Sequence, residues 1–130
     1  MSTNWKVKRL ETENGFVLLR MNTSLETKIR SASNVVKMTW HFSSENTMTS
    51  DLEKFEDLIE PLREREGFSY LAAVLTDVSS RRWVFYVTRP EQFLAELANF
   101  VEGYWSFIET DTGFDHGWHL YLTLLNLLDI

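Results

Sequence analysis

Cysteine is absent from this sequence of 130 residues, so disulfide bonds, thiolate metal sites and cysteine nucleophiles are all excluded. Long apolar runs are missing as well. The most apolar stretch, Leu120–Ile130, is interrupted by polar residues and falls far short of the roughly 20 residues that a membrane-spanning helix needs. No apolar segment typical of a signal peptide follows Met1. These absences lead us to expect a cytoplasmic protein with no membrane partner.

Positive charge is also in short supply. Thirteen Lys and Arg residues stand against nineteen Asp and Glu residues, a net charge of -6. This balance argues against nucleic acid as a partner, because nucleic acid attracts basic surfaces. Residues 1–37 nevertheless hold seven basic residues and only three acids. We expect these basic residues to solvate outer strands, where lysines discourage edge-to-edge pairing; a basic docking face is the alternative.

Motifs of the common enzyme classes are missing too. The sequence has no nucleophile elbow, phosphate-binding glycine loop, dinucleotide fingerprint or zinc-protease helix. Active sites assemble in space, so catalysis by His41 with Asp51 or Asp77 stays open, although nothing in the sequence supports it. We therefore lean toward a protein that is not an enzyme, and we expect no cofactor.

The chain does contain enough apolar material for one domain over residues 1–130. Hydrophobic residues make up 44% of the sequence and aromatic residues 14%, and a chain of this length buries roughly two-thirds of its unfolded surface. The aromatic excess indicates bulky core packing or a partner surface.

Strand patterns dominate the first part of the chain. Asn14-Gly15 is a strong hairpin signal because both residues tolerate a positive φ, and it joins expected strands at Trp5–Glu11 and Phe16–Met21. After a polar loop over residues 22–34, Val35–Phe42 alternates between apolar and polar side chains, as a half-buried strand does.

Two capping boxes predict helices. The first, Ser50 with Glu53, precedes an apolar stripe from Leu52 to Leu62. Pro61 should split off its last turn, and Gly67 should end it. That stripe consists of Leu52, Phe55, Leu58, Ile59 and Leu62.

The second capping box pairs Thr88 with Glu91 and has Pro90 in the first turn, where its missing N–H costs nothing. Gly103 should end this helix. The expected buried stripe consists of Phe93, Leu94, Leu97, Phe100 and Val101.

The remaining patterns predict strands and a last helix. Runs that are apolar on both faces, at Ser69–Thr76 and Arg82–Thr88, predict central strands, and Tyr104–Thr110 predicts a further strand. Trp118–Leu128 predicts a helix that is apolar almost all round, which must cover the second face of the sheet or another subunit.

From residue 34 the expected order is β-α-β-β-α-β, the ferredoxin-like pattern. We therefore predict an α+β, ferredoxin-like βαββαβ two-layer sandwich with an N-terminal β-hairpin and an extra apolar C-terminal helix. Residues 1–33 would form the hairpin and a loop, residues 34–110 the ferredoxin-like core, and residues 115–130 the C-terminal helix.

Few titratable residues are spaced for chemistry. His116 and His119 stand three apart beside Asp115, but a closed metal site needs about four ligands, so we expect Asp115 to cap the last helix instead. Glu109, Asp111 and Asp115 lack the spacing of a calcium loop and are expected in a solvated loop.

A small-ligand site near the sheet edge is the competing hypothesis. Its candidate ligand-binding residues are His41, Arg82, Asp115 and His119. No catalytic residue and no metal ligand is assigned. The aromatic residues of the inner strands are expected in the core rather than stacked on RNA bases, because the glycine and basic residues of an RNA reader are absent. These aromatic residues are Trp83, Phe85, Tyr86, Tyr104 and Trp105.

Four short motifs carry a resemblance to a known family. They are Arg82-Trp83-Val84-Phe85-Tyr86-Val87, Phe55-Glu56-Asp57, Trp40 in its strand, and Asp115-x-x-Trp118-x-x-Tyr121. On these residues the chain resembles the uncharacterised bacterial family catalogued as domain of unknown function 695, from about Phe16 to Leu124. The resemblance implies a small α+β sandwich and no known activity.

A second likeness rests on Gly113-Phe114-Asp115-His116-Gly117-Trp118. This segment is similar to the Gly-x-Tyr-Asp-Gly-Trp of the ribonuclease E activity regulator B family, with His116 inserted and Phe114 in place of tyrosine. That likeness implies an acidic, ferredoxin-like protein that acts by binding another protein.

The leading functional hypothesis is a non-catalytic regulatory or protein-interaction domain with a protein partner and a possible homodimer. The alternative is a small-molecule-binding protein or small hydrolytic enzyme with a polar site near the sheet edge.

Overall fold

The computed structural model describes residues 5–13, 15–25, 32–42 and 49–128, of which residues 49 and 50 are described in backbone only. The strands in these ranges are β1 (Trp5–Thr12), β2 (Gly15–Asn22), β3 (Asn34–His41), β4 (Glu64–Arg65), β5 (Ser69–Thr76), β6 (Ser80–Val87) and β7 (Ile108–Phe114). The helices are α1 (Thr49–Leu58), α2 (Pro90–Phe100) and α3 (His119–Leu128), with 3-10 turns η1 (Glu60–Leu62) and η2 (Glu102–Phe107).

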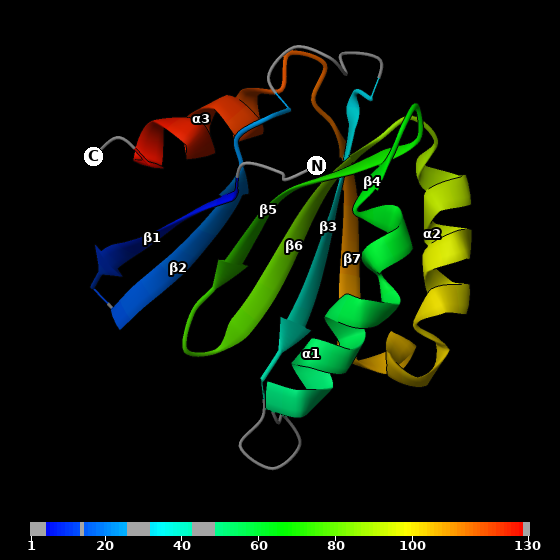
Figure 1. The fold of residues 1–130 in the computed structure, drawn as a ribbon, viewed down its shortest axis with the longest axis horizontal. Helices are drawn as coiled ribbons and strands as arrows, with labels where there is room; N and C mark the ends of the chain where they lie inside the picture. The colour runs from blue at the N-terminus through cyan, green and yellow to red at the C-terminus, as the bar shows by residue number, and fades with distance from the viewer. Residues whose placement is uncertain (1–4, 14, 26–31, 43–48, 129–130) are drawn as a thin grey trace.

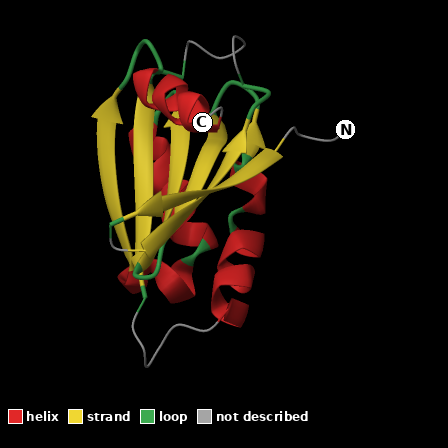
Figure 2. Cartoon of the chain, turned by 90° about the vertical axis from the view of Figure 1, so that its left-hand side faces the viewer, coloured by secondary structure: helices red, strands yellow, loops and turns green. Residues whose placement is uncertain are grey.

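The described strands form one sheet in the order β1-β2-β5-β6-β3-β7, with the short β4 beside β5. Each pairing is antiparallel. Helices α1 and α2 cover one face of the sheet, which we call the helix face (Figure 1). Figure 2 shows α3 crossing only the upper part of the other face, which we call the open face. This combination is the predicted α+β class.

Strand β3 shows how the sequence sorts side chains between the two faces. Val36, Met38 and Trp40 are buried in the helix-face core, whereas Lys37 and Thr39 line the open face. Successive side chains of a strand point to opposite faces, so the alternation predicted from the sequence is confirmed.

Aromatic rings tie the two helices to the sheet. Phe55 of α1 packs against Trp40 and Trp83 with ring centroids 5.5 and 4.8 Å apart, and Phe93 of α2 packs 4.9 Å from Phe85. The predicted core role of the inner-strand aromatics therefore holds for the buried Trp83, Phe85 and Tyr86. It is wrong for Trp105, which lies in the turn η2 and is 38% exposed.

Helix α3 packs on the sheet of its own chain. Trp118, Tyr121 and Leu124 are buried in a second core with Met21 and Tyr86. The indole of Trp118 stacks on the ring of Tyr86 with centroids 3.9 Å apart, and the Tyr121 hydroxyl donates to the carbonyl of Asn22 at 2.7 Å. The predicted coverage of the second face is thus observed at this end of the sheet.

The N-terminal hairpin lies where the sequence predicts it, with the register running from Trp5↔Asn22 to Thr12↔Gly15, but Gly15 begins β2 instead of standing in the turn. Gly15 has a φ of +129°, a conformation that favours glycine. The turn residue Asn14 lies outside the described residues.

The first predicted helix is correct in place but wrong in detail. Helix α1 ends at Leu58, and Pro61 lies in the separate turn η1, because a proline ring cannot continue the i→i−4 ladder. Gly67 does not end the helix. It has a φ of +78° in the turn between β4 and β5. Leu58 is 39% exposed rather than buried, and the predicted cap Ser50 lies in the range described in backbone only.

The second predicted capping box is wrong. The Thr88 hydroxyl donates to the carbonyl of Gly67 at 3.0 Å instead of capping α2, which begins at Pro90 without a side-chain cap. Helix α2 ends at Phe100, and Gly103 lies inside the turn η2. Pro90 in the first turn is confirmed.

The last strand lies four residues later than the Tyr104–Thr110 prediction. Residues 102–107 form the 3-10 turn η2, and β7 runs from Ile108 to Phe114. The acidic residues expected in a solvated loop, Glu109 and Asp111, therefore stand on an edge strand. No helix in the described part of the chain is long and apolar enough to cross a membrane.

Candidate functional site

Two adjoining hollows run along the open face where α3 leaves the sheet uncovered. The larger, of about 390 Å³, lies over β3, β6 and β7, and the smaller, of about 260 Å³, continues toward α3. Lys37 and Asp111 line both. We call the two hollows together the polar groove.

All four sequence-predicted ligand residues line the polar groove. His41 and Arg82 lie in the larger hollow, and Asp115 and His119 lie in the smaller one. The strand register brings His41 and Arg82 together, because β3 pairs with β6. The turn after β7 brings Asp115 and His119 to the same face.

The polar groove separates positive from negative charge. Lys37 and Arg82 stand on β3 and β6, and Glu109 and Asp111 stand on β7. The His41 Nε2 lies 2.8 Å from the Glu109 Oε1. Glu109 and Asp111 on the edge strand form what we call the acidic column. Lys37 and Arg82, on the two strands behind it, form what we call the basic column.

Arg82 donates from its Nε to the hydroxyl of Thr39 at 3.2 Å. Within the described part of the chain, neither Arg82 nor Lys37 has an ion-pair partner. A carboxylate or phosphate is the ligand chemistry that such cations can bind.

Asp115 stabilises the start of α3. Its carboxylate accepts hydrogen bonds from the backbone N–H groups of His119 and Leu120, at 2.8 and 2.9 Å, and from the hydroxyl of Tyr86 at 2.8 Å. Partial burial acts to raise the pKa of Asp115, but these donors outweigh it and lower the pKa. Burial and the hydrogen bond to Asp115 together raise the pKa of Tyr86, which stays a neutral donor. The expected cap at the start of α3 is thus present.

The histidine pair near Asp115 does not gather further ligands. His116 stacks on Phe114 with ring centroids 5.9 Å apart. Among the residues that the structure describes, no group of three or more His, Asp or Glu side chains is placed to hold a metal ion.

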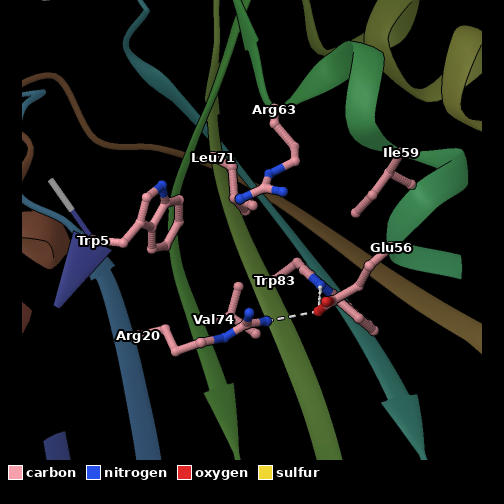
Figure 3. Close-up of a pocket in the computed structure, with 8 residues that line it drawn as sticks. All are labelled: Trp5, Arg20, Glu56, Ile59, Arg63, Leu71, Val74 and Trp83. Carbon is pink, nitrogen blue, oxygen red and sulfur yellow. Dashed lines mark hydrogen bonds and ion pairs between the residues drawn. The ribbon is translucent and has the colours of Figure 1, made fainter. Parts of the chain in front are cut away.

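A second polar cluster lies on the helix face and was missed by the sequence analysis (Figure 3). The Glu56 Oε2 of α1 accepts from Arg20 at 2.7 Å, from Arg81 at 3.2 Å and from the indole of Trp83 at 3.1 Å. Arg63 approaches the same space and lies over the ring of Trp5 at 5.6 Å. No local pattern links Glu56 with its partners, because these residues come from three separate elements, α1, β2 and β6.

Side chains almost fill the space around Glu56. About 10 Å³ remains there, which is no more than one water needs. We therefore interpret the Glu56 cluster as a clamp that holds α1 against β2 and β6, rather than as a ligand site.

The two edges of the sheet differ in a way that bears on function. Edge strand β1 carries Lys6, Lys8 and Arg9, as expected of a protected outer strand. Edge strand β7 carries no Lys, Arg or Pro, and its residues after Ile108 are all exposed. Its register with β3 is unbroken by a bulge from Trp40↔Ile108 to Asn34↔Phe114.

Exposed aromatic rings lie at both ends of β7. Phe107 precedes the strand with 47% of its surface exposed, and Trp105 is 38% exposed in the turn before it. Phe114 closes the strand with 73% exposed. Among the described residues no strand pairs with the outer edge of β7, which therefore presents backbone groups between large apolar side chains. The sequence analysis missed this combination because it placed the strand too early.

A comparison with protein-family models finds a match to the Family of unknown function (DUF695) over residues 3–126. No curated protein and no solved structure matches the chain. The likeness to the ribonuclease E activity regulator B family is not supported by a match. The family match covers nearly the whole chain, including β3, β6, β7 and the start of α3, which line the polar groove. The chain therefore belongs to the Family of unknown function (DUF695).

Proposed function

We propose that this protein is a non-catalytic protein-interaction domain that binds an extended segment of another protein as an added strand on β7. The observation that carries the proposal is the contrast between the two sheet edges. Natural sheets protect exposed edges with charged side chains, lysine above all, or with proline, bulges or a covering element. Strand β1 carries three basic residues, whereas β7 carries no Lys, Arg, Pro or bulge, and no other described strand pairs with its outer edge; its charged residues are the acids Glu109 and Asp111.

Strand addition uses the groups that β7 exposes. An extended segment binds a sheet edge through main-chain hydrogen bonds and gains specificity from alternate side chains. The exposed rings of Trp105, Phe107 and Phe114 supply apolar contacts at the two ends of the strand. Aromatic residues of this kind are enriched where proteins bind one another.

The proposal extends to the architecture. The order β7-β3-β6-β5, with α1 and α2 on one face, supports a ferredoxin-like core within a single domain. Because β7 runs to Phe114, this core extends four residues beyond the predicted range 34–110. The hairpin β1-β2 extends the sheet beyond β5, and α3 covers part of the open face. The cytoplasmic location stays a prediction from the sequence.

Affinity capture from native lysate with edge variants tests the function. Thr112 lies beside Val36 on the helix-face side of β7. Thr112→Lys gives β7 the lysine with which natural sheet edges discourage strand addition, so partner binding should fall by at least about tenfold, the factor that 1.4 kcal/mol gives. Val7→Lys makes the same change on β1, at a residue that is 64% exposed, and should keep the partner.

Both variants must unfold at the same denaturant concentration as the unmodified protein, so that loss of binding is not loss of folding. Thr110→Lys provides a second edge variant with the same expected result. A partner that binds Thr112→Lys and Thr110→Lys normally, or one that is lost with Val7→Lys alone, would overturn the proposal.

A small-molecule-binding role is the second candidate, favoured by one observation. The four candidate ligand residues share one groove, in which Lys37 and Arg82 have no ion-pair partner among the described residues. A thermal-shift screen with small carboxylates and phosphates tests this role, because a ligand that binds only the folded state raises Tm. Loss of any shift in Arg82→Gln would support it, and a screen without shifts would count against it.

A further inference from the structure

The open-face side of β7 presents two carboxylates where an added strand would lie. Glu109 and Asp111 are two residues apart, so both point to the polar groove. Glu109 contacts His41 yet keeps 76% of its side chain exposed. Within the described residues, Asp111 has no ion pair and is exposed.

The surrounding segment strengthens this negative charge. Residues 102–115 contain four acids and no Lys or Arg. The opposite edge of the sheet is basic, with Lys6, Lys8 and Arg9 on β1. The acidic character is therefore local to β7 and not an average of the net charge.

We infer that the segment bound by β7 carries Lys or Arg at alternate positions, opposite Glu109 and Asp111. The inference rests on the proposed strand addition and specifies its partner. Side chains directly opposite each other on neighbouring strands lie about 5 Å apart, where opposite charges attract and like charges repel. A segment with alternate basic residues places every second side chain against the acidic column.

Lys37 and Arg82 of the basic column do not cancel the preference of β7 for a segment with basic side chains. Lys37 lies opposite Asp111 on β3, and Arg82 lies on β6, so they are one and two strands further from the edge. Strands are about 4.8 Å apart, and an added strand therefore meets the two acids first.

The same charges disfavour a second copy of this chain as the occupant. In a two-fold antiparallel pairing centred on Asp111, that residue would face Asp111 of the partner subunit. In a pairing centred on Thr110, Glu109 would face Asp111 of the partner subunit. Like charges directly opposite are destabilising, so we assign the edge to a different, basic protein segment.

Two synthetic peptides of eight residues test the inference. One alternates Val and Thr with Lys, and the other has Glu in place of each Lys. We expect the Lys peptide to bind about tenfold more tightly, with amide chemical shifts changing along residues 108–114, because two opposite-charge pairs replace two like-charge pairs. In Glu109→Lys with Asp111→Lys, the Glu peptide should become the tighter ligand.

A matched variant separates the effect of the charges on β7 from the effect of the net charge of the protein. Glu53→Lys with Asp57→Lys makes the same charge change on exposed positions of α1, and the Lys peptide should remain preferred there. Equal affinities of the two peptides, reversal in the α1 variant, or shift changes away from residues 108–114 would overturn the inference.

The outcomes also separate this inference from the proposed function. If Thr112→Lys abolishes capture of the native partner but the peptides show no charge preference, the basic partner is wrong and strand addition stands. If the native partner binds Thr112→Lys normally, strand addition is wrong and the inference falls with it.

Discussion

Two polar clusters, one around Asp115 and one around Glu56, hold helices in place, and the sequence alone predicts only the first. Asp115 precedes the last helix in sequence, so its cap on His119 and Leu120 follows from local pattern. Glu56 is bonded to residues 25 to 36 positions away. Its partners meet only because β2, β5 and β6 are neighbours in the sheet, which no local signal in the sequence reveals.

The Glu56 clamp predicts a stability effect. Glu56→Gln removes the charge that two arginines and an indole N–H share, and should lower the free energy of unfolding by about 1–3 kcal/mol, as hydrogen bonds to charged groups contribute. Urea denaturation measures the change. Glu53→Gln, an exposed residue of the same helix, should lie within about 0.5 kcal/mol of the unmodified protein. Equal stability of the two variants would show that the clamp contributes nothing.

Asp115 predicts a pH dependence of stability. Its pKa is lowered in the folded state, so its contribution is fully present above the unfolded pKa, near 3.9, and is lost as pH falls through the folded pKa. Asp115→Ala should cost about 1–2 kcal/mol near pH 7, the range of a lost helix cap. That cost should shrink below about pH 4.

Denaturation at several pH values compares Asp115→Ala with Asp57→Ala. Asp57 is exposed on α1 and serves as the control whose cost should stay small throughout. A cost of Asp115→Ala that is the same at about pH 7 as below about pH 4 would contradict the ionic cap.

At the scale of elements, the sequence predicts most strands and helices but misplaces their ends. The alternation in β3 and the stripe of α1 survive, because burial in one core fixes which side chains face inward. The capping signal at Thr88 fails because its hydroxyl donates to Gly67 instead. The start of β7 is missed because residues 102–107 wind into a 3-10 turn with apolar side chains that resemble those of a strand.

From the packing of α3 we expect two of its leucines to contribute very differently to the free energy of unfolding. Leu124 is buried against the open-face core, and Leu122 is 49% exposed. Leu124→Ala should lower the free energy of unfolding by about 2–4 kcal/mol, and Leu122→Ala should change it by less than about 1 kcal/mol. Because α3 packs on its own chain, the cost of Leu124→Ala should not depend on protein concentration. A cost that grows on dilution would indicate packing between subunits.

For the whole molecule, the sheet has one face sealed by helices, one face partly sealed by α3, and two unlike edges (Figure 2). The charge asymmetry along the sequence predicted a protected basic edge, and β1 is that edge. The acidic edge could not be located from the sequence, because Glu109 and Asp111 read as loop residues. The candidate ligand residues were found individually, whereas the groove that unites them depends on the strand order.

The central claim is that β7 is the surface to which a partner adds a strand. Amide hydrogen exchange of the complex with the captured partner tests it most directly, since exchange slows where backbone N–H groups become hydrogen-bonded or buried. We predict that exchange slows along Ile108–Phe114 and stays unchanged along Trp5–Thr12. Slowed exchange in β1 or α3, with β7 exchanging as in the free protein, would contradict the account.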